Sequence, residues 1–221
     1  QPATAHFIAG KLYHFFVSDD AAPEEAIELL ATTYIESKYD IRAVMGVLLR
    51  ADFFKEARFT KVKSPIELVA GVLRLVGAFQ EIEPGLMDAA VESAYIGQEL
   101  LNPPTVEGWH TGKEWIDSGS LVGRVNFASD HVGNIEYPGV QAIIRRLASQ
   151  GTSLSPEELV DGCLELIGPL KVGPNTRNPM VAQAHRGGEL RSDTLEGRAE
   201  LALLVGETLQ LIVATREFQF A

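Results

Sequence analysis

Apolar residues recur every three to four positions along nearly the whole chain, and this period constrains the fold more than any other feature. It is clearest at Ile41, Val44, Met45, Leu48 and Leu49, which share one helical face. The pattern predicts helices at about 3–17, 23–38, 40–50, 64–76, 84–97, 121–127, 140–147, 155–167, 180–185 and 194–216. Strand alternation is unconvincing everywhere, and only 209–213 leaves a strand as an alternative. We therefore expect an all-α protein, an irregular multi-helix bundle.

Two segments carry strong signals for a helix start. Ser64-Pro65-Ile66-Glu67 places a hydroxyl at the N-cap, proline at the first helical position and a carboxylate at the third, as in a capping box. Ser155-Pro156-Glu157-Glu158 repeats this arrangement. Asp40 is expected to cap the helix that follows it, and Pro84 to open the helix that runs to Gly97.

Residues 98–120 are expected to form one long loop, because prolines and glycines interrupt the helical period there. Pro103-Pro104 are followed by glycines at 108, 112 and 119. Trp109 and Trp115 lie in this segment, which favours an ordered, packed loop. We expect residues 1–130 to form a helical core with this loop, and 131–221 a helical extension on the same domain, with a last helix at about 194–216.

The charge balance excludes one class of protein. Nineteen Lys and Arg against thirty Asp and Glu give a net charge of −11 in 221 residues, so a nucleic-acid partner is not expected. The sequence contains no apolar stretch of membrane-spanning length. Because it begins at Gln1 and runs directly into a helical pattern, we expect it to be the C-terminal part of a longer protein.

The first candidate site is a short basic strip, Arg58, Lys61 and Lys63, directly before the Ser64 helix start. A helix N-terminus and nearby cations together favour an anion. The alternative is that these cations pair with carboxylates of neighbouring acidic helices, which is the commoner situation in an acidic protein. Both interpretations stay open at the level of sequence.

The second candidate is the long loop itself, with Asn102, Trp109, His110 and Trp115. Its tryptophans either pack on the helices or line a groove for a ligand or partner. Gly112-Lys113 is not a phosphate-binding loop, because Glu stands where that motif needs glycine and Glu follows the lysine.

Metal and cofactor chemistry are not predicted. The five histidines lack metal-ligand spacing, and Cys163 lies in an apolar helical face, typical of a buried thiol. Neither a metal site nor a cofactor is expected, and the carboxylate pairs at 19–20 and 24–25 are explained by helix starts.

Three blocks of sequence resemble the bacterial family called domain of unknown function 1800. Residues 2–12 with 15–17 are similar to its "HPATARFIARKL…FV" segment, with Gln1 in place of the leading histidine. Residues 61–69 are similar to "KVKSPVELV", and 97–127 to "GQ…PPNVAGW…G…W…R.NF", which includes Arg124 and Asn126. The end of the chain, 211–220, resembles the family's "ASPEFQ" end, whereas 131–195 has no evident counterpart.

The resemblance implies a compartment and a companion, and no activity. Members of this family often bear export signals and commonly occur beside genes for a secreted sulfatase-like family, domain of unknown function 1501. An exported protein with a companion of that type is therefore the expectation.

Two hypotheses of function follow. The first, which the sequence favours, is a non-catalytic scaffold or partner-binding module. The second is an enzyme or small-ligand domain that binds an anionic group beside Ser64, with Lys61, Lys63 and Arg124 as charge clamps and Trp109 as a platform. The second predicts that these side chains converge on one cleft.

Overall fold

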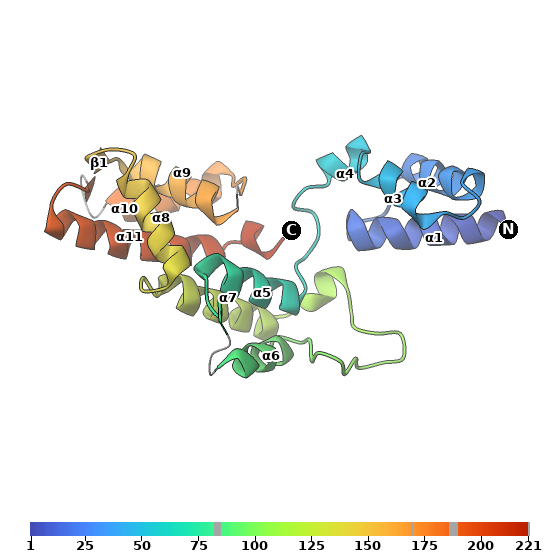
Figure 1. The fold of residues 1–221 in the computed structure, drawn as a ribbon, viewed down its shortest axis with the longest axis horizontal. Coiled ribbons are helices and arrows are strands. Elements are labelled where there is room, and N and C mark those ends of the chain that lie inside the picture. Colours follow the sequence, from blue (N-terminus) through green and yellow to red (C-terminus); the bar gives the residue numbers. More distant parts are fainter. Residues whose placement is uncertain (82–84, 169, 186–189, 221) are drawn as a thin grey trace. The chain divides into compact units, whose positions relative to one another are not determined.

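The fold is all-α, as the helical period predicts. A computed structural model describes residues 1–81, 85–168, 170–185 and 190–220, and it contains eleven α-helices in that part of the chain (Figure 1). The strands within these residues are limited to β1, Ser153–Leu154, and β2, Leu190–Arg191, which pair antiparallel. Residues 209–213, where a strand was the alternative, are helical.

The described chain divides into two compact units, each with its own core. The first unit comprises Gln1–Val62 together with Thr111–Glu114 and the C-terminal Phe220, and the second comprises Lys63–His110 and Trp115–Gln219. The boundary that we expected near residue 130 falls inside a helix of the second unit, α7, Ser118–Gly133.

The first unit is built on α1, Pro2–Phe16, which packs along α2, Glu24–Glu36. Next come α3, Ile41–Leu48, and the short α4, Asp52–Glu56. Asp40 caps α3, as predicted, by accepting a 2.8 Å hydrogen bond from the Arg42 amide. The core consists of small and branched side chains that include Ala5, Ala9, Leu30, Val44 and Leu48.

The second unit surrounds its last helix, α11, Leu195–Val213. Its other helices are α5 at Pro65–Val76, α6 at Leu86–Tyr95, α7, α8 at Pro138–Ala148, α9 at Pro156–Ile167 and α10 at Pro174–Ala184. α11 contacts α7, α8 and α9 and buries Leu201, Val205, Leu209 and Ile212 completely or nearly so. One short 3₁₀ turn, η3 at Glu217–Gln219, follows it.

Both predicted capping boxes are present. The Ser64 hydroxyl accepts from the Glu67 amide while the Glu67 carboxylate accepts from the Ser64 amide, and Ser155 with Glu158 makes the same pair. A third box, between Asp117 and Ser120, starts α7. The sequence did not predict this box, because serine replaces the usual Glu or Gln at the third position.

This third box shortens the long loop. The expected loop of 98–120 ends earlier, because the 3₁₀ helix η1, Gly112–Trp115, and then α7 occupy its last part. The helix expected at 121–127 extends instead over Ser118–Gly133, since Asp117 satisfies the amides of Gly119 and Ser120.

Three other boundaries differ from expectation. Pro84, the expected start of the fifth long helix, lies outside the described residues, and α6 begins at Leu86. α10 spans eleven residues rather than 180–185, because it accommodates Pro179 in its interior. α11 ends at Val213 instead of 216, and its N-cap is Thr194, whose hydroxyl accepts from the Gly197 amide.

Gly139 permits a close approach of α8 to α5. A Cβ at this position of α8 would overlap the Leu75 carbonyl oxygen and the Val76 backbone of α5. A rigid backbone cannot move aside as a flexible side chain can, so only glycine fits there.

We therefore predict that Gly139→Ala destabilises the protein by about 2 kcal/mol or more, because α8 must shift away from α5. Gly71→Ala in α5 is the matched control: a Cβ there meets open space. It should stabilise the protein by about 0.5–1 kcal/mol through helix propensity. Urea unfolding of both variants measures the difference, and equal effects of the two would contradict this account of the contact.

Candidate functional site

The conspicuous polar side chain of the second unit is Arg124, in the middle of α7. It is fully buried, at 0% exposure. Its Nε donates to Gln219 Oε1 at 2.8 Å and its Nη2 donates to the Lys63 carbonyl at 2.7 Å. A buried guanidinium requires such acceptors, because desolvation of a charge is costly unless hydrogen bonds replace the lost water.

Gln219 connects the C-terminal tail to the same place. The Lys63 amide donates to the Gln219 carbonyl at 2.9 Å, and the Gln219 side-chain amide donates to the Val213 carbonyl at 3.2 Å. Three segments thus meet at Arg124: the chain before α5, the middle of α7 and the tail after α11. We call Lys63, Arg124, Phe218 and Gln219 the Arg124 cluster.

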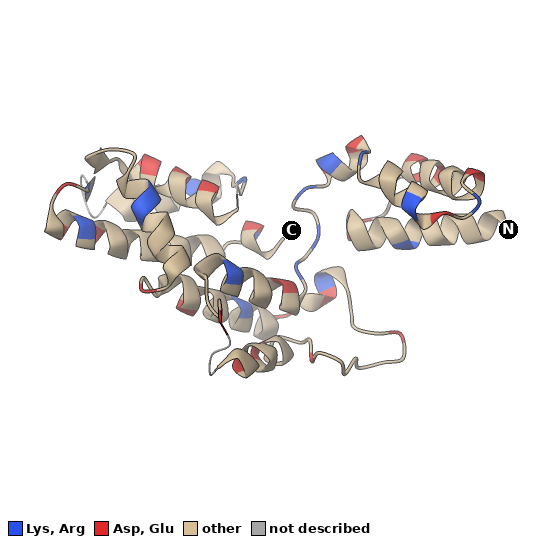
Figure 2. Ribbon diagram, viewed as in Figure 1, with Lys and Arg blue, Asp and Glu red and all other residues tan. Residues whose placement is uncertain are grey.

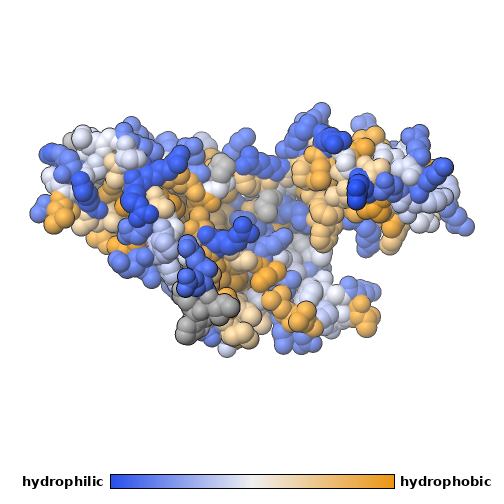
Figure 3. All heavy atoms as spheres, viewed as in Figure 1, coloured by the Kyte–Doolittle hydropathy of each residue, from blue (hydrophilic) through white to orange (hydrophobic). Residues whose placement is uncertain are grey.

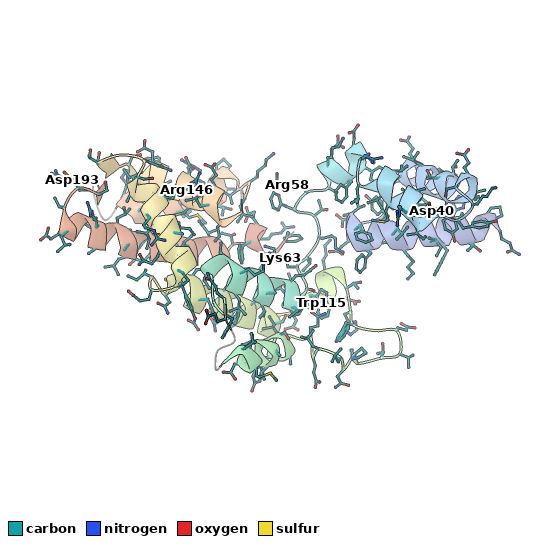
Figure 4. All side chains as sticks on the ribbon, in the orientation of Figure 1. Asp40, Arg58, Lys63, Trp115, Arg146 and Asp193 are labelled. Carbon is teal, nitrogen blue, oxygen red and sulfur yellow. The ribbon has the colours of Figure 1, made fainter. Side chains whose placement is uncertain are left out.

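Lys63 completes the cluster from the start of α5, where Figure 4 labels it. Its ammonium donates to the Phe218 carbonyl at 2.7 Å and lies 4.2 Å from the centre of the Phe218 ring. Burial, and then repulsion by Arg124, lower the pKa of Lys63 to about 8. Burial also lowers the pKa of Arg124 to about 10, while the Glu67 carboxylate acts in the opposite direction.

The N-terminus of α5 has its first amides satisfied within the protein. The Ile66 amide donates to the buried Gln98 side chain at 3.0 Å, and the Glu67 amide donates to Ser64 Oγ at 3.4 Å. The Leu68 amide donates to the Ser64 carbonyl. An anion at this helix start would have to displace these bonds. Gln98 was not among the predicted site residues, although it belongs to the Gly97-Gln98 block of the family resemblance.

The basic strip is divided between different environments. Figure 2 shows Lys and Arg positions in blue along the segment between α4 and α5. Arg58 lies over the ring of Phe59 at 4.7 Å. Lys61 belongs to the first unit, where its ammonium donates to the His14 carbonyl at 3.0 Å and lies 3.5 Å from Asp19 Oδ1. Carboxylate pairing, one of the two interpretations of the strip, is therefore found at Lys61.

The predicted residues of the loop are also separated. Asn102 donates to Glu99 at 2.8 Å on the surface. Trp115 is buried, whereas His110 is exposed. The Trp109 indole nitrogen is buried, and no hydrogen-bond partner for it is found among the described residues. Asn126 lines a separate cavity of about 510 Å³, together with Asp88, Glu92 and Asp130.

Of the predicted site residues, the structure thus brings together Lys63 and Arg124. They meet as an internal support around the tail rather than as the walls of a cleft. The sequence could not show this, because the acceptor Gln219 lies 95 residues after Arg124.

The remaining candidates for chemistry are the thiol of Cys163 and groups of metal-binding side chains. Cys163 is completely buried, and burial raises the pKa of its thiol to about 12. In the part of the chain that the structure describes, no three His, Cys, Asp or Glu side chains are grouped so that they could hold a metal ion.

The all-α architecture and the buried Arg124 cluster define the class as a helical domain closed by its own C-terminal tail. A family model described as "Protein of unknown function (DUF1800)" matches residues 1–220, so the chain belongs to this family. The match includes 131–195, for which the sequence showed no evident counterpart. Comparisons with curated proteins and with solved structures gave no match. In the described part of the chain, each helix is too short or too polar to cross a membrane.

The lowered pKa of Lys63 predicts a pH-dependent stability. Between about pH 8 and 10.5 the unfolded chain holds a proton on Lys63 that the folded chain has released, so the free energy of unfolding should rise with pH in that window. Wild type should gain this stability and Lys63→Met should not. We expect the unfolding free energy of wild type minus that of Lys63→Met to rise by about 1 kcal/mol or more over this range.

Urea unfolding of both proteins at intervals of half a pH unit measures this difference in unfolding free energy. Subtracting the value of Lys63→Met from that of wild type cancels the contribution of the other titrating groups. A difference that stays constant with pH would contradict the buried position of the ammonium.

Proposed function

We propose that the chain is a non-catalytic, partner-binding helical module of an exported bacterial protein. The observation that carries this proposal is an apolar stripe on α6. Met87, Val91 and Tyr95 follow each other at intervals of four residues and are 77%, 49% and 80% exposed. Helical residues at this spacing lie on one face.

The stripe is separate from the face that α6 uses inside the protein. α6 also contacts α5 and α7, and its Ser93 is completely buried. Apolar residues remain exposed in the segment that follows, where Leu101 is 97% exposed. Figure 3 shows hydrophobic residues at the surface in the part of the view that holds α6 and this segment. Exposed apolar residues that gather on one helix face are typical of interaction sites.

The polar groups around the start of α5 also favour a partner-binding module over an anion-binding domain. Lys63 and Arg124 are engaged by backbone carbonyls and Gln219, and the first amides of α5 by Gln98 and Ser64. These groups stabilise the domain, so they favour a structural role for Lys63 and Arg124 over an anion clamp beside Ser64. A sulfatase-like companion of the domain of unknown function 1501 type remains the proposed partner, and export the proposed location.

The test is to isolate the protein from periplasmic and secreted fractions of its source and to identify what co-purifies. We expect a companion protein with wild type and at least a tenfold loss of it with Met87→Gln, Val91→Gln and Tyr95→Gln combined, because apolar anchors carry most binding energy at interfaces. The control combines Leu195→Gln and Leu203→Gln, two exposed leucines of α11. Absence of the protein from these fractions, or a companion retained equally by both variants, would count against the proposal.

A further inference from the structure

The first unit contains a cavity that the proposed function does not use. It has a volume of about 370 Å³, within the range of small-molecule sites, and it is lined by the ammonium-bearing side chains Lys11, Lys61 and Lys113, with His14 and a single carboxylate, Asp19. With His14 neutral, the lining carries a net charge of two positive. The sign of this charge is opposite to that of the whole chain, whose net charge is −11.

The carboxylate in the lining is engaged by the protein. Asp19 Oδ2 accepts a 2.7 Å hydrogen bond from the Val62 amide, and Oδ1 lies 3.5 Å from the Lys61 ammonium. The side chain is only 11% exposed. Its negative charge therefore serves to hold the 61–62 segment, and it positions Lys61 at the cavity.

Lys61 keeps capacity for a ligand. Its ammonium has three donors, of which one goes to the His14 carbonyl at 3.0 Å and one points toward Asp19. Lys11 and His14 lie three positions apart on α1 and so share a face, which directs both toward the same space.

A separate segment adds Thr111, Gly112 and Lys113 to the lining, and Gly112 lies close to Asp19. Gly112 has φ +62°, and a Cβ on it would lie 3.1 Å from Asp19 Cβ and Cγ. Lys113 lies 3.5 Å from Asp20 Oδ1. The glycine thus lets this segment approach Asp19, and Lys113, the next residue, lines the cavity.

We propose that this cavity binds the phosphate or sulfate group of a small organic monoester. Such a group presents three oxygens that accept hydrogen bonds from separated ammonium groups, and lysine is a common point-charge partner for it. Phe15, which is 71% exposed and also lines the cavity, offers an apolar surface for the organic part. The site is independent of the α6 stripe, which belongs to the second unit.

The test is calorimetric titration of the whole chain with phenyl phosphate and with phenyl sulfate, which separates the two esters, and with benzyl alcohol as the uncharged control. We expect saturable binding of at least one ester and none of the alcohol. Lys11→Gln and Lys113→Gln should each weaken binding about two- to fivefold, and together roughly tenfold, as expected for exposed charge contacts.

Lys55→Gln is the matched control, because Lys55 is an exposed lysine of the same unit that pairs with Asp52 outside the cavity. It should leave the affinity unchanged. Failure of both esters to saturate the protein would overturn the proposal, as would a double variant that binds as tightly as Lys55→Gln. Both substituted lysines are on the surface, and a melting temperature equal to that of wild type confirms that the double variant is folded.

Discussion

The second unit depends on one buried charge. A guanidinium without exposure to water needs hydrogen-bond acceptors, and the Nε and Nη2 of Arg124 find them in the Gln219 side chain and the Lys63 carbonyl. Its buried Nη1 has no partner among the described residues. These two acceptors come from opposite ends of the unit's sequence. The requirement to satisfy Arg124 therefore fixes both the entry of the chain into α5 and the position of the tail after α11.

The helices and their starts could be predicted from sequence, because they depend on local signals. Ser64 and Ser155 identify capping boxes within four residues, and the apolar period identifies the buried faces. Where a local signal was weaker, the prediction was wrong: Asp117 starts α7 earlier than expected, and Pro179 is accommodated inside α10. The start of α7 depends on a capping box that uses serine in place of Glu or Gln, and α10 continues through a proline that usually ends a helix.

The role of the candidate site residues could not be predicted, because it depends on contacts between distant segments. Arg58, Lys61 and Lys63 are neighbours in sequence and were considered as one basic strip. In the structure Lys63 supports the tail through Phe218, whereas Lys61 lies beside Asp19 at a cavity of the first unit. One short run of cations thus serves two different purposes, and the α6 stripe supplies a third feature that charge patterning alone would not reveal.

The role of Arg124 is tested most directly by comparing Arg124→Met with Arg177→Met in amide hydrogen exchange and in urea unfolding. Arg177 makes two hydrogen bonds to Asp161 at the surface, so it matches the number of Arg124 contacts without the burial. We predict that Arg124→Met removes protection from the Lys63 and Gln219 amides and lowers the unfolding free energy by about 2–5 kcal/mol, since one buried and one partly buried acceptor lose their donor. Arg177→Met should lower it far less, because its ion pair with Asp161 is exposed to water. Equal, small losses for the two variants, with the Lys63 and Gln219 amides still protected, would contradict the central role of Arg124.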